Sequence, residues 1–122
     1  MSYRVGDIVH VSGLGLPYRD SKFCVFVTVS PNQFFLINSK NRQMYDCIPL
    51  LKNGRKFPRH DSFIACSRVF QADDSQIDSH HGALEDNELQ LLMTHVNLSK
   101  TLTGIQKKQI TSAIAAELIK RS

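Results

Sequence analysis

The sequence predicts a mainly β fold, a small antiparallel barrel followed by two amphipathic helices, within a single domain of 122 residues. Short β-rich runs separated by Gly, Pro and Asn fill the first two-thirds of the chain, a pattern typical of small barrels. Beyond residue 78 the apolar residues instead recur with a helical period. We therefore expect a barrel over 1–78 and helices over 84–98 and 103–121 packed on it.

The first three strands are expected at 7–12, 23–30 and 33–38. The first run alternates around β-branched residues and ends at a glycine-containing loop, whereas the other two are continuously apolar on either side of a Pro-Asn turn. Continuously apolar runs of this length belong to the buried centre of a sheet. Of the consecutive residues Phe34 and Phe35, one should face the core and the other should face outward, as a base-stacking platform or a dimer contact.

The apolar segment 44–51 contains Pro49, which cannot donate to a strand ladder and therefore indicates an edge position. The dipeptide Asn53-Gly54 predicts a tight hairpin after it, because both central residues of a type I′ turn need positive φ. A long and mostly apolar final strand is expected at 61–70. Farther on, His80-His81 is interpreted as part of a solvent-exposed linker rather than a metal site, since no other ligand pattern accompanies it.

Two helices are expected after the strands. Acidic residues at 85–88 suit the start of the first helix, and Thr103 and Gln106 have the spacing of a capping box at the start of the second. Each helix carries an apolar stripe that it cannot bury alone, so both should pack on the barrel or on a partner. The stripes are Leu89, Leu92, Met93 and Val96 in the first helix, and Ile110, Ala113, Ile114 and Leu118 in the second.

The basic residues are unevenly distributed. Lys and Arg number 15 against 11 Asp and Glu, which gives a net charge of +4. Residues 40–59 hold an excess of basic residues, whereas Asp73, Asp74 and Asp78 form an acidic stretch without a nearby partner. An asymmetry of this kind is typical of a surface that binds a polyanion, and equally of a solvated hairpin that keeps the protein soluble.

Other classes of protein fit the sequence poorly. No apolar run is long enough to span a membrane, and the N-terminus has no signal-peptide core. Cys24, Cys47 and Cys66 are odd in number and lie in apolar strand context, which predicts buried free thiols rather than a disulfide framework or a zinc ribbon. We expect a cytoplasmic protein without a cofactor or a bound metal ion.

Several motifs occur in an order that resembles a known family. The opening Arg4-Val5-Gly6-Asp7-Ile8-Val9 is similar to an Arg-x-Gly-Asp/Glu-Ile/Val start, and the loop 13–22 lies where that family has its long first loop. The stretch 61–69 looks like a Ser-Val-Val strand, and Gly82-Ala83-Leu84 leads into a helix like a Gly-x-Leu motif. Over roughly residues 4–100, by order of elements more than by identity, the chain resembles the MazF/PemK-type toxins, which are SH3-like barrels of the MazF/PemK/CcdB type.

The resemblance implies a homodimeric, cofactor-free endoribonuclease of bacterial, plasmid or phage origin that an antitoxin neutralises. Such enzymes cut single-stranded RNA by directing a 2′-hydroxyl at the adjacent phosphate. In this chain Arg19 or Lys22 would supply the stabilising cation, Ser39 matches the family's Thr/Ser, and His60 beside Asp61 could act as acid or base. The expected catalytic residues are therefore Arg19, Ser39 and His60, and the expected RNA-binding residues are Lys22, Arg42, Arg55 and Lys56.

Because of two departures from the family pattern, we favour the inference of the family's fold over the inference of its activity. Ser21-Lys22 stands where the family has Arg-Pro, and Ala65 and Ser67 stand where some active members carry Arg and Asp. A non-catalytic barrel that binds nucleic acid or a protein partner is therefore the second hypothesis. A purely structural or assembly protein, suggested by the two amphipathic helices, is the third.

Overall fold

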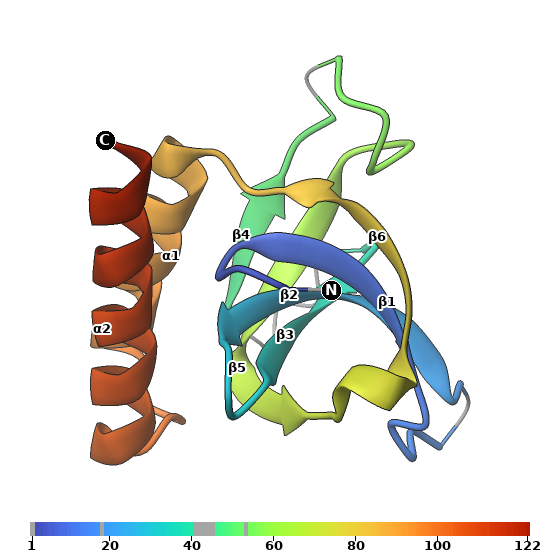
Figure 1. Cartoon of the computed structure of the whole chain (residues 1–122), viewed down its shortest axis with the longest axis horizontal. Coiled ribbons are helices and arrows are strands. Elements are labelled where there is room, and N and C mark those ends of the chain that lie inside the picture. Colours follow the sequence, from blue (N-terminus) through green and yellow to red (C-terminus); the bar gives the residue numbers. More distant parts are fainter. Residues whose placement is uncertain (1, 18, 41–45, 53) are drawn as a thin grey trace.

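Six antiparallel strands form one strongly curved, barrel-like sheet, and two helices lie side by side along one flank of it (Figure 1). The computed structural model describes residues 2–17, 19–40, 46–52 and 54–122. The sheet order is β4-β5-β3-β2-β1-β6. In chain order the elements are β1 (Asp7–Ser12), β2 (Ser21–Thr28), β3 (Gln33–Asn38), β4 (Cys47–Leu50), β5 (Ser62–Gln71), η1 (Asp74–Gln76), β6 (Ile77–Ala83), α1 (Asp86–Leu98) and α2 (Gly104–Arg121).

The mainly β architecture with two C-terminal helices is confirmed. β1 and β3 begin and end at the predicted residues, while β2 starts and ends two residues before the predicted run. Pro49 lies in β4, which is an edge strand as expected. The hairpin predicted at Asn53-Gly54 is described only in part, because Asn53 lies outside the described residues. Arg55 N–H donates to the carbonyl of Lys52 at 2.8 Å and closes a turn there, but no strand follows before β5.

β6 was not predicted, and the interpretation of His80-His81 as a linker was wrong. The strand pairs with β1 through Val9 opposite His80 and His10 opposite Ser79. Two register shifts interrupt this pairing, and Gly82 has a φ of +118°, a backbone conformation that only glycine adopts easily. The sequence of β6 is polar, and the bulges break its two-residue period. The strand therefore forms through its hydrogen bonds to β1 and cannot be recognised from its side-chain pattern.

The sheet buries side chains on both of its faces, which corrects the prediction for Phe34 and Phe35. Phe35 belongs to the main core, which the helices cover, while Phe34 packs in a second core with Val9 and Phe26 on the opposite face. Both phenylalanines are 0% exposed. The N-terminal segment helps to cover the second core, since the Tyr3 ring stacks on Phe26 at 5.1 Å. Neither Phe34 nor Phe35 is available as a base-stacking platform.

The two helices bury the predicted stripes against the sheet. Leu89, Leu92 and Val96 of α1 are buried, as are Ile110 and Ile114 of α2. Thr103 Oγ1 accepts a hydrogen bond from the backbone N–H of Gln106, whose side chain accepts one in return from the Thr103 N–H. Among the helices that the structure describes, none has both the length and the apolar character needed to cross a membrane.

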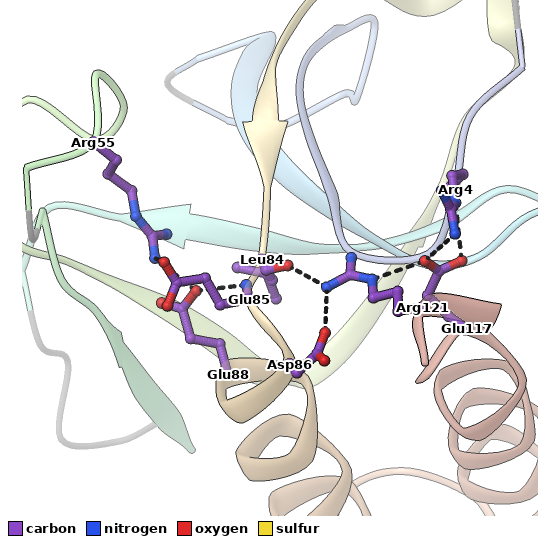
Figure 2. A network of polar contacts seen from close by, with 8 residues as sticks. All are labelled: Arg4, Arg55, Leu84, Glu85, Asp86, Glu88, Glu117 and Arg121. Carbon is purple, nitrogen blue, oxygen red and sulfur yellow. Dashed lines mark hydrogen bonds and ion pairs between the residues drawn. The ribbon is translucent and has the colours of Figure 1, made fainter. Parts of the chain in front are cut away.

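A polar network joins the helix pair to the sheet (Figure 2). Arg121, near the end of α2, donates to the Leu84 carbonyl at 2.7 Å and to Asp86 Oδ1 at 3.1 Å, at the start of α1. It also pairs with Glu117 at 2.8 Å, and Glu117 accepts in turn from Arg4 of the N-terminal segment. Glu117 is only 4% exposed, so these two guanidinium groups balance a buried charge.

Candidate functional site

Histidine, aspartate and aromatic side chains from four parts of the chain meet on one side of the sheet. We call this group the histidine cluster: His10 of β1, Phe23 of β2, Phe57 of the β4–β5 connection, and Asp78 and His81 of β6. The pairing register explains most of it, because His10 lies opposite Phe23 on one side and opposite Ser79 on the other. His81 follows Ser79 by two residues and therefore shares its face of the strand.

Phe23 is the centre of the cluster. Its ring centroid lies 5.0 Å from the His10 ring, 5.0 Å from the His81 ring and 4.4 Å from the Phe57 ring. Phe57 also contacts His81 directly, at 5.4 Å between centroids. The two imidazoles thus pack against the same phenyl ring. Their centroids lie no farther apart than twice the 5.0 Å that separates each of them from the Phe23 centroid. All four rings are half-buried, so each keeps an accessible edge or face.

A bulge in β6 directs Asp78 toward β1. The register passes from His10 opposite Ser79 to Val11 opposite Ile77, which leaves Asp78 as the extra residue. Asp78 Oδ2 accepts hydrogen bonds from His10 Nδ1, at 2.9 Å, and from the Ser12 hydroxyl. These hydrogen bonds, with Ser12 contributing most, hold the pKa of the Asp78 carboxyl below its usual value.

The acidic stretch therefore does have partners, contrary to the prediction from the sequence. Asp78 is bonded to β1, and Asp74 Oδ1 accepts a hydrogen bond from the Asn32 side chain at 2.6 Å. Both contacts join residues that are more than 40 positions apart in the chain, and for that reason charge counting along the sequence does not reveal them.

His81 lies in a different environment from His10. Burial lowers its pKa, and the positive charges that His10 and His80 acquire on protonation lower it further. Its Nε2 is 2.7 Å from the Ser79 hydroxyl. His80, the preceding residue, turns to the opposite face, where its Nε2 is 3.5 Å from Asp7 Oδ1. The consecutive histidines therefore belong to separate sites.

The β4–β5 connection brings basic residues to the cluster. We call residues 54–61 of this connection the basic loop. It projects from the sheet near the end of β6 (Figure 1) and is fixed there by the contacts of Phe57. Lys56, Arg59 and His60 are exposed on this loop. Asp61 Oδ1 accepts from the Lys52 N–H at 2.8 Å and so closes the base of the loop rather than contacting His60.

Arg55 of the basic loop is directed away from solvent, toward α1. Its Nη2 lies 2.7 Å from Glu88 Oε1 and 3.8 Å from Glu85 Oε1 (Figure 2). The side chain is 17% exposed, and its Nη1 is buried and has no hydrogen-bond partner among the residues that the structure describes. Of the basic residues expected to bind RNA, Arg55 thus forms ion pairs within the protein, while Lys56 remains exposed.

The other residues expected from the sequence lie apart from the histidine cluster. Arg19 is exposed on the β1–β2 loop, which Figure 1 shows well separated from the basic loop. Ser39 is exposed just after β3, beside Asn38, whose Oδ1 accepts a hydrogen bond from Lys22 Nζ. Among the described residues no contact joins Arg19, Ser39 and His60. Arg42 lies outside the described residues.

Two of the three cysteines are buried as the sequence predicts. Cys24 and Cys66 are buried free thiols, and burial raises the pKa of each to about 12. Cys47 is a free, half-buried thiol. Within the described parts of the chain, no group of three or more His, Cys, Asp or Glu side chains is arranged to hold a metal ion.

The histidine cluster escapes sequence reasoning because its members are spread from residue 10 to residue 81. Single histidines in a strand usually serve packing or face solvent. Moreover β6, one of the two strands that pair with β1, has no recognisable strand pattern in its sequence. The one available signal was the combination of a histidine pair with a nearby aspartate at 78–81. No protein-family model matches the chain and no curated protein matches it, so the geometry of these residues is the basis for assigning a function.

Proposed function

We propose that this protein binds single-stranded RNA and cleaves it without a metal ion, as a divergent relative of the MazF/PemK-type toxins on an SH3-like barrel. The observation that carries the proposal is the packing of Phe57 against Phe23 and His81. This packing brings an exposed basic loop beside two imidazoles and accessible aromatic rings. Positive charge, stacking surfaces and groups that exchange protons near neutral pH are what RNA binding and transesterification require.

The resemblance of the motifs to the toxin family supports the same function. It also implies a cytoplasmic homodimer that an antitoxin partner neutralises, and we include both in the proposal. The residues that would carry the chemistry differ from the family pattern, because the proposed surface uses β1, β6 and the basic loop.

A non-catalytic barrel that binds nucleic acid or a protein partner is the second candidate. Ala65 and Ser67 of β5 favour it, since neither offers a charged group where some active members of the toxin family carry Arg and Asp. In its nucleic-acid-binding form this candidate shares the RNA-binding surface and differs only in that the bound strand is not cut; in its protein-binding form it binds no RNA.

Incubation of the full chain with fluorescein-labelled single-stranded RNA in EDTA tests the proposal. Anisotropy measures binding and a denaturing gel measures cleavage. We expect binding that weakens steeply with salt, together with cleavage. Binding without cleavage would support the second candidate instead, and no binding at low salt would overturn the RNA-binding proposal.

A pair of double variants locates the surface. Lys56→Ala/Arg59→Ala removes two exposed charges from the basic loop, and Lys100→Ala/Lys120→Ala removes two exposed charges from the helical region. If both loop residues contact phosphates, the loop variant should make the dependence of log Kd on log salt shallower by about 1.4. The helical variant should leave this slope unchanged. Equal effects of the two variants would contradict the location.

A further double variant, Arg19→Ala/His60→Ala, tests the residues expected from the sequence. Full cleavage activity in this variant would remove Arg19 and His60 from the catalytic site while leaving the proposed function intact.

A further inference from the structure

We propose that His81 and His10 are the acid–base pair of this RNA cleavage: His81 accepts the proton of the attacking 2′-hydroxyl, and His10 donates a proton to the leaving 5′ oxygen. The inference rests on the proposed function and adds the residues that perform the proton transfers.

The positions of the two imidazoles suit a phosphodiester placed between them. Each ring is 5.0 Å from the centre of Phe23, and they approach it at interplanar angles of 64° and 85°. In an in-line displacement the attacking and leaving oxygens lie on opposite sides of phosphorus, so the reaction needs two proton-transfer groups on two sides of one phosphate. One histidine on β1 and another on β6 meet this requirement.

His10 is suited to donate a proton because of its bond to Asp78. An ionised carboxylate only accepts hydrogen bonds, so His10 Nδ1 must carry the hydrogen in the 2.9 Å contact with Asp78 Oδ2. This contact orients the ring and leaves Nε2 as the nitrogen that would donate to the substrate. Ser12, which donates to the same oxygen, keeps the carboxylate in place.

His81 is suited to accept a proton because burial and the neighbouring imidazoles lower its pKa and so favour the neutral ring. Its neighbours are the uncharged rings of Phe23 and Phe57, the imidazoles of His10 and His80 that oppose its protonation, and Asp78, whose carboxylate is bonded to β1. The Ser79 hydroxyl, 2.7 Å from His81 Nε2, lies where a substrate hydroxyl would have to lie. A ribose 2′-hydroxyl would replace it as the partner of this nitrogen.

The reaction balances without any other reactant. The 2′ oxygen loses its proton to His81 and forms a bond to phosphorus. The bond between phosphorus and the 5′ oxygen breaks, and that oxygen takes a proton from His10. The products are a 2′,3′-cyclic phosphate and a 5′-hydroxyl, and proton exchange with water returns both histidines to their starting states.

The test compares the variants His10→Gln and His81→Gln of the full chain with the wild type, using labelled single-stranded RNA in EDTA. His95→Gln, on α1, is the matched control. We expect each cluster variant to lower the cleavage rate at least about 100-fold, with RNA affinity retained and with cyclic phosphate ends on the wild-type products. Circular dichroism and thermal unfolding establish that each variant is folded.

A substrate with a sulfur in place of the 5′ leaving oxygen separates catalysis from a structural effect. A thiolate leaves without protonation, so this substrate should restore cleavage by His10→Gln and should not restore cleavage by His81→Gln. Failure of the sulfur substrate to rescue His10→Gln would overturn the assigned role of His10.

The remaining outcomes are distinct. If the wild type cleaves and both cluster variants cleave at a similar rate, the acid–base pair is wrong and the proposed function stands. If the wild type binds RNA but never cuts it, the cleavage proposal fails and this inference fails with it.

Discussion

At the scale of single residues, the histidine cluster depends on Asp78, which a bulge in β6 leaves unpaired and directs toward His10 and Ser12. The two imidazoles beside it have different partners. His10 pairs with a carboxylate, whereas His81 packs among aromatic rings and a hydroxyl. This difference in partners is the reason for assigning the two histidines opposite roles in the proposed proton transfers.

The lowered pKa of His81 predicts how stability changes with pH. Because the unfolded chain binds a proton at this residue more readily than the folded protein, the free energy of unfolding should decrease as pH falls below 6.5, the ordinary value for histidine. Urea unfolding of the wild type and of His81→Gln at pH 7.5 and pH 5 measures this change. The variant should lose less stability than the wild type over this interval; an equal or larger loss would contradict the prediction.

The thiols should differ sharply in reactivity. With pKa values of about 12, Cys24 and Cys66 form almost no thiolate near neutral pH, and both are buried. We expect an aromatic disulfide reagent to modify only Cys47 in the folded protein, and all three thiols in denaturant. Mass spectrometry of the labelled peptides identifies the sites, and rapid native labelling of Cys24 would contradict their burial.

At the scale of elements, β6 determines the candidate site. It adds a polar strand to the edge of the sheet next to β1 and supplies Asp78, Ser79 and His81 to the cluster. Ser79 and His81 share one face because they are two residues apart, and the bulge at Asp78 brings that carboxylate to His10 and Ser12 as well. In a regular strand Asp78 would point to the face opposite Ser79.

Two glycines provide a matched test of this element. Gly82 has φ +118° and Gly104 begins α2, and at either position an added Cβ would meet no atom of the described residues within 4 Å. Gly82→Ala should lower the free energy of unfolding by about 1–3 kcal/mol, because alanine rarely adopts this backbone conformation. Gly104→Ala should leave stability unchanged or raise it by up to about 1 kcal/mol, since alanine fits a helix and has fewer unfolded conformations.

Thermal or urea unfolding measures both glycine variants. Equal effects would show that the backbone of β6 is not constrained at Gly82. A normal stability of Gly82→Ala combined with a weakened cleavage rate would instead assign the bulge a purely positional role beside His81.

At the scale of the whole molecule, the helices and the sheet share one apolar core and one polar network. The core runs from Ile8 and Phe35 of the sheet to Leu92 and Ile114 of the helices. Arg121 joins the end of α2 to the β6–α1 connection, and Glu117 joins α2 to the N-terminal segment (Figure 2). The same connection carries Glu85 and leads to Glu88, which together hold Arg55 of the basic loop.

Removing Arg121 should therefore weaken the attachment of the helices. Arg121→Ala should lower the free energy of unfolding by about 2 kcal/mol, because it breaks charged hydrogen bonds to Glu117, Asp86 and a buried carbonyl. Arg121→Lys should recover only part of this loss, since an ammonium group cannot match the planar fork of the guanidinium. Lys120→Ala, at the exposed neighbouring position, should change stability by less than about 0.5 kcal/mol.

Urea unfolding measures these three variants. A full recovery by Arg121→Lys would show that only the charge matters and that the directional hydrogen bonds contribute nothing.

Features that depend on neighbouring residues could be predicted from the sequence. Period-two and continuously apolar runs located β1 and β3, Pro49 marked an edge strand, and the Thr103–Gln106 spacing marked the start of α2. Each of these signals acts within one element, through backbone conformation or side-chain alternation, and can therefore be recognised in the sequence.

Features that depend on residues far apart in the chain could not be predicted and emerge from the folded sheet. The second core, which buries Phe34, forms because the N-terminal segment covers the outer face of the sheet. β6 exists because β1 offers an edge to pair with, and Asp78 reaches His10 across 68 positions because the pairing is bulged there. Composition and spacing carry no record of such pairings, and therefore the histidine cluster emerges only once the sheet is formed.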